Sequence, residues 1–346
     1  MCKMNTVSGA MTLVDVRSGV VNPSYLTISH NNRFLYSVSE ISGHDEQGRG
    51  LVISFSINDQ THELKFLNSQ PSHGSSPCHL TIDKNDRYVL VSNYGSGSLA
   101  VLPVMPDGRL GVAAEVVRHA RSIIDLVRQR NPHVHSSALD ADNHFAVVAD
   151  LGLNKLLVYR FDEKSGTLRP VENSCVRAAA GAGPRQLAFA PNGRRAFVTN
   201  ELNSTLAVFD YDPRTGQLKE SQVLSTLPAA SGGVNICADV QVHPSGSFVY
   251  ASNRGYDSIA VFRVDKDRGS LRVVQHQSSL GKTPRGMAID PTGRFLLVAN
   301  QDSDSIAVFA VDVETGTLSV TTYALKIPTP ACACFSPRPL QEVSET

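Results

Sequence analysis

The sequence predicts an all-β fold: a seven-bladed β-propeller with four-stranded antiparallel blades, whose ring is closed by N- and C-terminal strands. Three observations predict it: a repeated hairpin, a regular spacing of the repeats and a last repeat that the chain leaves unfinished. Six segments are variants of one unit, among them CHLTIDKNDRYVLVSN, RQLAFAPNGRRAFVTN and RGMAIDPTGRFLLVAN. Each has an apolar run, a turn such as PNG or PTG and a second apolar run, the pattern of a β-hairpin.

Two residue markers give the spacing of the repeats. The Asn or Asp that closes the second run falls, with gaps of 57, 50, 53 and 47, at Asn93, Asp150, Asn200, Asn253 and Asn300. A glycine further along follows with gaps of 58, 50, 53 and 47, at Gly108, Gly166, Gly216, Gly269 and Gly316. A unit of this length buries its apolar face only against its neighbours, which indicates the blades of a propeller.

The unfinished repeat fixes the expected domain organisation. We expect one domain over residues 1–346, with six full blades in 22–329. The seventh begins at PACACFSP, so residues 330–346 would supply its C-terminal strand and a tail. Residues 1–21, with AMTLVDV as one strand, would complete it. Closing the ring in this way removes the exposed sheet edges.

Composition excludes several classes of partner. The 32 Lys and Arg residues balance 32 Asp and Glu residues, so no basic field indicates a nucleic acid or an anionic membrane. No stretch of about 20 apolar residues indicates a membrane span. The six cysteines are scattered, which is typical of reduced thiols, and Cys332 and Cys334 are expected to pack in the core from one strand. We expect a cytoplasmic monomer that binds a small molecule.

Aligning the blades predicts where that molecule binds, because the start of the first strand and the end of the second meet at one mouth of the channel. Just before the innermost strand the blades carry Ser24, Cys78, His135, Arg185, Ala238, Arg285 and Ala331. Just after the second strand they carry Glu40, Tyr94, Leu151, Glu201, Arg254 and Gln301. A repeat kept only for packing would hold similar residues at these positions, so the charged residues predict a site.

The surroundings of this site leave several interpretations open. Arginine and glutamate at blade junctions also form purely structural ion pairs, and His79 is as readily a packed histidine as a ligand contact. His133 and His135 are two residues apart, but without a further His or Cys cluster we expect no metal and no cofactor. Three long inserts, residues 41–50, 121–131 and 227–235, are expected to cover the mouth.

Six stretches in order resemble the lactonase family of seven-bladed propellers: NPSYL, SNYGSGSL, PHVHS, GPRQLAF with TNEL, SNRGYDSIAVF and PRGMAIDPTGRFLLVANQDSDSI. That family includes propeller-type 6-phosphogluconolactonases and carboxymuconate-cyclising enzymes. The resemblance implies a metal-independent lactone hydrolase or lactone-forming enzyme whose catalytic residues are His135, Arg185, Glu201 and Arg254. Gln186 stands where the family usually has a second histidine, which predicts an altered choice of substrate.

Each of these residues has an expected role. His135 would activate water, because an ordinary imidazole pKa suits neutral pH. Arg185 and Arg254 would bind a carboxylate or polarise the lactone carbonyl. Glu201 would orient His135 or carry a proton to the leaving oxygen. The residues expected to bind the rest of the substrate, including a phosphate, are His79, Arg285, Gln301, Glu40 and Arg128.

The leading hypothesis is hydrolysis of a sugar lactone, 6-phosphogluconolactone first. One alternative is a cycloisomerase that closes an unsaturated dicarboxylate to a lactone, because the same arginines would bind its carboxylates. The other is a non-catalytic propeller that binds a partner through its rim, because fold alone does not specify function.

Overall fold

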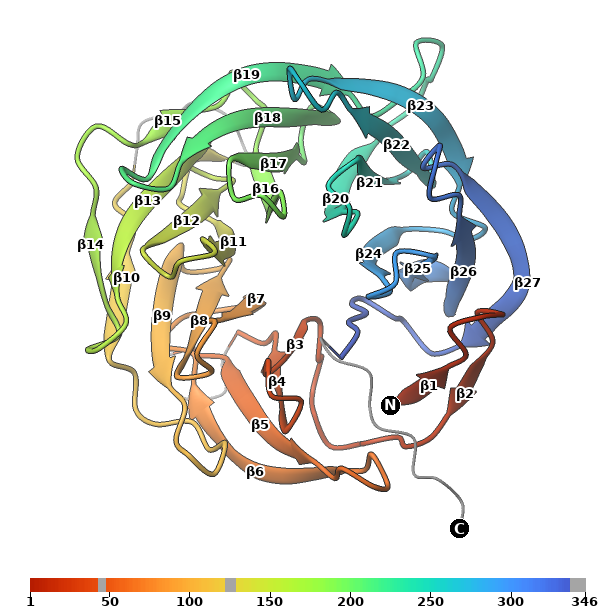
Figure 1. The fold of residues 1–346 in the computed structure, drawn as a ribbon. Coiled ribbons are helices and arrows are strands. Elements are labelled where there is room, and N and C mark those ends of the chain that lie inside the picture. Colours follow the sequence, from red (N-terminus) through yellow and green to blue (C-terminus); the bar gives the residue numbers. More distant parts are fainter. Residues whose placement is uncertain (43–47, 122–128, 337–346) are drawn as a thin grey trace.

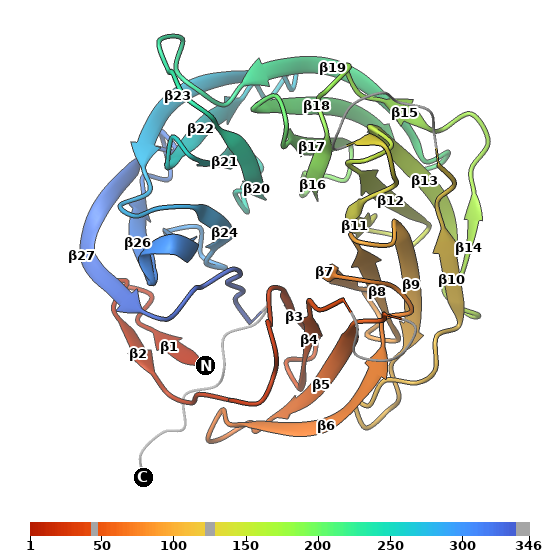
Figure 2. The same ribbon diagram turned by 180° about the vertical axis from the view of Figure 1, so that it is seen from behind.

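The computed structural model describes residues 1–42, 48–121 and 129–336, which fold into β-sheets around a central channel (Figure 1). Six sheets are antiparallel and contain a consecutive run of four strands, and one of them carries an additional short strand, β15. In each, the first strand lines the channel and the fourth lies at the rim (Figures 1 and 2). The predicted propeller of four-stranded blades is therefore confirmed.

The six blades follow the chain in order. Blade 1 contains β3 (Leu26–Ile28), β4 (Phe34–Ser39), β5 (Leu51–Ile57) and β6 (Leu64–Pro71). Blade 2 contains β7 (Pro77–Ile82), β8 (Tyr88–Asn93), β9 (Ser98–Pro103) and β10 (Glu115–Arg118). Blade 3 contains β11 (Val134–Leu139), β12 (Phe145–Asp150), β13 (Lys155–Asp162), β14 (Thr167–Pro170) and β15 (Val176–Arg177). Blade 4 contains β16 (Pro184–Phe189), β17 (Arg195–Asn200), β18 (Thr205–Asp212) and β19 (Gln217–Ser225). Blade 5 contains β20 (Ile236–Val242), β21 (Phe248–Arg254), β22 (Ser258–Val264) and β23 (Leu271–Ser278). Blade 6 contains β24 (Pro284–Ile289), β25 (Phe295–Asn300), the 3-10 turn Gln301–Ser303, β26 (Ser305–Val311) and β27 (Leu318–Lys326).

The hydrophobic core lies between neighbouring blades. Second strands such as β12, FAVVAD, are buried along their whole length, whereas the outer strand β19 is mostly exposed. One core cluster joins Phe145 and Val147 of blade 3 to Leu187, Val198 and Phe209 of blade 4. Because burying each large apolar side chain contributes roughly 1.5–3 kcal/mol, contacts between blades hold the ring together.

The repeated glycine has a packing role. Gly108 and Gly316 lie in turns between third and fourth strands, with φ of 84° and 77°, a conformation that glycine adopts without strain. A Cβ on Gly108 would collide with the ring of Phe34 in the preceding blade, and one on Gly316 would collide with Phe248. The glycine spacing therefore marks the points where one blade docks on the next.

The repeated asparagine ties the connections between blades. Asn93 Nδ2 donates to the backbone oxygen of Ser72 at 2.9 Å, and Asn253 Nδ2 donates to that of Thr226 at 2.9 Å. In blade 3 the equivalent residue is Asp150, whose carboxylate contacts the buried ring of His119 instead. A carboxylate cannot donate to a carbonyl, so the histidine in the connection matches the change from Asn to Asp.

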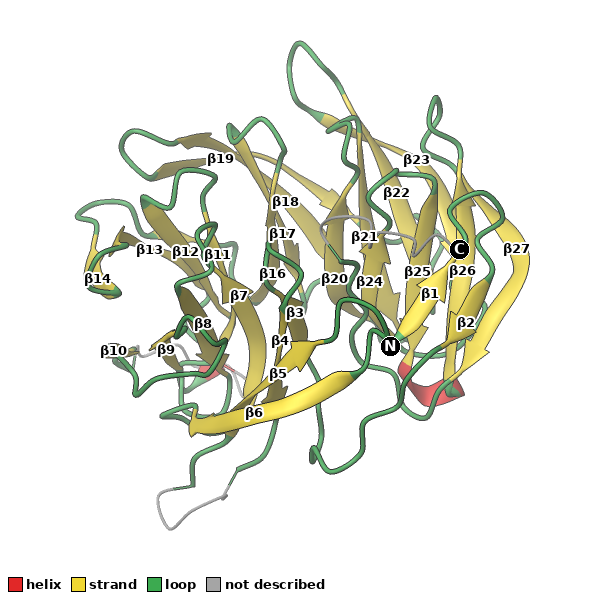
Figure 3. Ribbon diagram, turned by 60° about the horizontal axis from the view of Figure 1, so that its bottom comes forward, coloured by secondary structure: helices red, strands yellow, loops and turns green. Residues whose placement is uncertain are grey.

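The chain ends differ from the sequence expectation. Strands β1 (Cys2–Met4) and β2 (Met11–Leu13) form a separate two-stranded sheet, which lies beside β27 (Figure 3). Residues 330–336 carry no assigned strand, because they make no ladder with a neighbouring strand in the described part of the chain. The strand predicted to begin at Pro330 is therefore wrong for these residues. Residues 337–346 lie outside the described ranges.

The predicted core packing of Cys332 and Cys334 is also corrected, since both side chains line the central cavity. All six cysteines are free. Among the helices that the structure describes, none is long and apolar enough to cross a membrane.

Candidate active site

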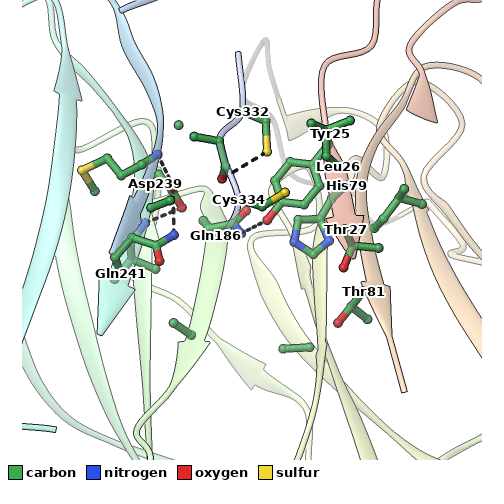
Figure 4. A pocket seen from close by; sticks show the side chains of 18 of the residues that line it. Tyr25, Leu26, Thr27, His79, Thr81, Gln186, Asp239, Gln241, Cys332 and Cys334 are labelled. Carbon is green, nitrogen blue, oxygen red and sulfur yellow. Dashed lines mark hydrogen bonds between the residues drawn. The ribbon is translucent and has the colours of Figure 1, made fainter. Parts of the chain in front are cut away.

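A cavity of about 560 Å³ occupies the central channel. Its wall comes from the first strands of the blades and from residues 331–336, and Figure 4 shows part of it. Its size suits a small organic ligand. Four of the predicted site residues lie on this wall: His79, His135, Arg185 and Arg285.

In blades 2, 3, 4 and 6, the residues of the first predicted ring are bulged residues within the innermost strands. In β11, Val134 pairs with Asp150 and Ser136 with Ala149, so His135 has no partner of its own. The same register shift leaves Cys78, Arg185 and Arg285 unpaired in β7, β16 and β24. The prediction placed these residues before the strand, whereas they lie one residue inside it. A bulge adds local twist and changes the direction of its side chain, which explains why this position carries the site.

Arg185 belongs to a buried ion cluster between blades 4 and 5. Its Nε donates to Glu201 Oε2 at 2.9 Å, and its NH1 donates to the backbone oxygen of Ala238 at 2.7 Å. Arg254 NH2 donates to the same Glu201 oxygen at 3.0 Å and to the backbone oxygen of Cys237 at 2.9 Å. The side chains of Arg185 and Glu201 are 5 % and 4 % exposed. One carboxylate thus fixes two guanidinium groups.

Arg285 forms a looser ion pair across the junction of blades 6 and 1. Its NH2 lies 3.4 Å from Glu40 Oε2, and the two side chains are 24 % and 19 % exposed. No other hydrogen bond holds this guanidinium among the described residues. Arg285 is therefore the more available of the two cations on the cavity wall.

His135 is buried beside these arginines. Its Nδ1 lies 3.9 Å from Cys78 Sγ, and its ring meets that of Tyr94 edge-on with centroids 5.6 Å apart. Burial, followed by the charges of Arg185, Arg285 and Arg254, lowers the pKa of His135 well below its usual range. The premise of an ordinary histidine pKa is thus wrong: His135 is neutral at pH 7 and can accept a proton.

The other predicted site residues lie away from the cavity wall. Glu201 contacts both Arg185 and Arg254, and Glu40 contacts Arg285. Gln301 follows β25, where its backbone N–H donates to Thr283, and it is absent from the described lining. Arg128, with the inserts at 43–47 and 122–128, lies outside the described residues. The ring of His133 stacks on Tyr94, and its Nδ1 lies 2.9 Å from the Tyr94 backbone oxygen.

Sequence reasoning missed several wall residues one step beyond the bulge or close to the channel: Tyr25, Gln186 as a wall residue, Asp239, Cys332 and Cys334 (Figure 4). Asp239 follows the bulge position in blade 5, as His79 does in blade 2. Both accept a backbone N–H from the next blade: Asp239 Oδ2 from Met287 at 2.7 Å and His79 Nδ1 from Ser137 at 3.5 Å. The repeat alignment contained this signal one column further along.

These two residues have opposite pKa shifts with one cause. Burial raises the pKa of Asp239 to about 6 and lowers the pKa of His79 to about 3. Their hydrogen bonds identify both as links between blades.

No group of three or more His, Cys, Asp or Glu side chains placed to hold a metal occurs in the ranges that the structure describes. The described wall combines imidazoles, guanidinium ions, the Asp239 carboxyl and uncharged hydrogen-bonding side chains. Fold and site together define a β-propeller with a cationic small-molecule cavity in its channel.

Comparison with known proteins agrees with this class. The sequence matches the model of the family described as lactonase, 7-bladed beta-propeller, over residues 1–335. The chain belongs to this family of seven-bladed lactonase propellers.

Individual relatives extend the match. A 6-phosphogluconolactonase of Bacillus subtilis is 34% identical over 288 residues, which cover 83% of this chain and 80% of that protein. A 6-phosphogluconolactonase of Formosa agariphila is 33% identical over 289 residues, with the same coverage of 83% and 80%. The structure of a periplasmic gluconolactonase of Pseudomonas aeruginosa superposes with a TM-score of 0.88 at 31% identity, covering 95% of this chain and 92% of that one.

Proposed function

We propose that this protein is a lactonase that hydrolyses 6-phosphogluconolactone to 6-phosphogluconate without a metal ion. One observation carries the proposal: the cavity wall places a neutral, buried histidine, His135, among guanidinium groups that a shared carboxylate holds in place. Relatives named 6-phosphogluconolactonase support the choice of substrate.

The proposed chemistry follows from charge. A water molecule attacks the lactone carbonyl while His135 accepts its proton, and negative charge develops on the carbonyl oxygen. Arg185 stabilises that oxyanion because its guanidinium is already oriented by Glu201 and Ala238, so little reorganisation is needed during the reaction. The positive charges of three arginines disfavour a protonated His135, and the negative oxyanion offsets this repulsion while it is present. Proton transfer to His135 is therefore coupled to the attack of water. The proton then returns to the ring oxygen as the ester bond breaks.

Glu201 has a different role from the one the sequence suggested. Its described contacts are with Arg185 and Arg254, so we assign it to positioning these arginines rather than to orienting His135. Arg254 donates to the same oxygen of this carboxylate and to the Cys237 carbonyl. Both residues act through Arg185, and neither lies on the described cavity wall.

Arg285 is assigned to the phosphate of the substrate. Its ion pair with Glu40 is long and partly exposed, so a phosphate dianion can replace Glu40 as its partner at little cost. His79 would contact the substrate only through its Nε2 or by packing, because its Nδ1 accepts a backbone N–H.

We also propose how the propeller ring closes, that the protein is a monomer and that it is cytoplasmic. Gly9, between β1 and β2, meets the ring of Phe295 as Gly108 meets Phe34, which supports β1 and β2 as the third and fourth strands of a seventh blade. Residues 330–336 would be its inner segment, making residues 1–346 one domain. A closed ring needs no partner to cover its sheet edges, which favours a monomer, and a phosphorylated sugar substrate favours a cytoplasmic location.

Acid release in a pH-stat tests the proposed activity. The purified protein is given 6-phosphogluconolactone, gluconolactone or a carboxymuconolactone, with and without a chelator, after subtraction of spontaneous hydrolysis. We expect fast opening of the phosphorylated lactone, unaffected by chelator and lost in His135→Ala. No acceleration of any lactone, or full activity in His135→Ala, would contradict the proposal.

A further inference from the structure

The cavity wall has two chemically different layers. The bulged residues at the mouth include the neutral imidazole of His135 and the charged guanidinium groups of Arg185 and Arg285. Neighbouring positions carry neutral or hydrogen-bonded side chains, and Figure 4 shows several of them together: Tyr25, His79, Gln186, Asp239, Cys332 and Cys334. We call Tyr25 and Gln186 the floor pair.

The floor pair spans the channel. Gln186 Nε2 donates to the hydroxyl of Tyr25 at 3.3 Å. Gln186 lies in β16 of blade 4, whereas Tyr25 directly precedes β3 of blade 1, and these strands lie on opposite sides of the channel (Figure 1). The ring of Tyr25 packs on His79 with centroids 4.3 Å apart, which fixes its direction. The cavity wall also includes residues further along the same strands, such as Ile28 and Ala188, so this hydrogen bond crosses the cavity without closing it.

The floor pair retains unused hydrogen-bonding groups. His79 and Asp239 accept backbone N–H groups of the next blade. Within the described ranges, the Tyr25 hydroxyl accepts one hydrogen bond and donates none, and Gln186 Oε1 accepts none. Burial raises the pKa of Tyr25 well above its usual range, so the phenol keeps its proton. One free donor and one free acceptor therefore face the same cavity.

We propose that Tyr25 and Gln186 bind a ring hydroxyl group of a polyhydroxylated lactone, while the arginines of the mouth bind its carbonyl and its phosphate. A sugar hydroxyl both donates and accepts, so it can accept from the Tyr25 O–H and donate to Gln186 Oε1. This inference rests on the proposed lactonase function and makes the floor pair a determinant of specificity for sugar lactones. A lactone without ring hydroxyls would leave both groups unpaired in a buried site, which is unfavourable.

Paired changes in substrate and enzyme test the proposal. The values of kcat/KM are measured for 6-phosphogluconolactone and for its 2-, 3- and 4-deoxy analogues, with wild type, Tyr25→Phe and Gln186→Met. Loss of one neutral hydrogen bond corresponds to about tenfold in kcat/KM. We expect wild type to lose about a hundredfold on one particular deoxy analogue, because the missing hydroxyl removes both hydrogen bonds. Tyr25→Phe should lose about tenfold on the parent lactone but should have the same kcat/KM as wild type on that analogue, which makes neither bond.

The outcomes separate this inference from the proposed function. If Tyr25→Phe and Gln186→Met each lose the same factor on the parent and on every deoxy analogue, the pair has only a structural role and the inference is wrong. It is also wrong if wild type treats all four substrates alike, or if neither variant changes kcat/KM. Tyr256→Phe, which removes a hydroxyl outside the described cavity wall, is the matched control and should behave as wild type. Failure of wild type to open the parent lactone would instead reject the proposed function.

Discussion

Two arginines occupy equivalent bulge positions on the cavity wall and are held very differently. Arg185 makes hydrogen bonds of 2.9 Å to Glu201 and 2.7 Å to a backbone oxygen, deep between two blades. Arg285 has one contact of 3.4 Å to Glu40, whose side chain is 19 % exposed. The repeat places both arginines in the same backbone geometry, but their hydrogen-bond and ion-pair partners give them different roles.

A repeat fold can therefore give two equivalent positions different roles in one site. A buried, fully paired guanidinium is a fixed positive charge, suited to an oxyanion that forms only in the transition state. A loosely paired guanidinium can exchange its partner, which suits a ground-state group such as phosphate. If the two arginines have these different roles, substitutions around each should affect different properties of the protein.

The largest effect is expected on the fixed side. Glu201→Gln removes the charge shared by Arg185 and Arg254 and leaves two buried guanidinium groups uncompensated. We expect a loss of about 3–5 kcal/mol in the free energy of unfolding, measured by urea denaturation. The matched change Glu40→Gln should cost less than about 1 kcal/mol, because exposed pairs are screened by solvent. Equal losses in the two variants would remove the distinction between the two arginines.

His135, on the same cavity wall as the two arginines, should control the rate of the chemical step. His135→Gln keeps a polar side chain but removes the proton acceptor, and we expect kcat to fall by about a hundredfold or more while KM changes little. Steady-state kinetics in the pH-stat provide the measurement. His133→Gln, just before β11 and absent from the described cavity wall, should stay within about threefold of wild type. A variant at His135 that keeps its kcat would move the general base elsewhere.

On the exchangeable side, Arg285→Ala should act on binding of phosphorylated substrate. Loss of a charge-assisted contact predicts a KM for 6-phosphogluconolactone raised by about 30-fold, with unphosphorylated gluconolactone unaffected. Arg185→Ala should lower kcat/KM for both lactones. Should Arg285→Ala impair both lactones equally, the phosphate assignment falls.

A smaller effect concerns pH and the links between blades. The folded-state pKa of His79 is about 3, below its ordinary value of about 6.5. Only the unfolded chain binds this proton between the two values, so the stabilisation is present above pH 6.5 and is lost as pH falls. We expect a contribution of about 1.4 kcal/mol per pH unit below pH 6.5.

Thermal and urea unfolding of wild type and His79→Gln across pH 4 to 7 would measure this slope. The slope should be shallower in the variant. Asp239 acts in the opposite direction, since its pKa is raised to about 6 and its stabilisation is lost as pH rises through that value. An identical pH dependence in wild type and His79→Gln would show that His79 is not held neutral.

The repeat made much of this predictable. Gaps between equivalent Asn and Gly residues located six blades. The alignment of the repeats also predicted that His135, Arg185 and Arg285 lie together at one end of the channel, and all three line the cavity. Contacts between strands of different blades were beyond reach: the hydrogen bond from Gln186 to Tyr25 joins residues 161 positions apart. The bulges were also missed, because a one-residue register shift leaves no mark in an apolar pattern. The hydrogen bonds of Asp239 and His79 to the next blade could not be predicted, because the sequence does not show which backbone N–H each bulge leaves free.

The chain ends resisted prediction for a different reason. Residues 330–336 read as a strand because their side chains alternate, yet a strand also requires a partner for its ladder. That partner is not specified by the local sequence. Pattern alone therefore predicted a strand that residues 330–336 do not form, and core packing for two cysteines that line the cavity.

A crystal structure of the wild-type protein with 6-phosphogluconate tests the central claim most directly. We predict the product inside the channel, with its carboxylate within hydrogen-bond distance of Arg185 and its phosphate against Arg285 in place of Glu40. Product bound outside the channel, or inside it with the phosphate on Arg185, would contradict the assignment of a fixed and an exchangeable cation.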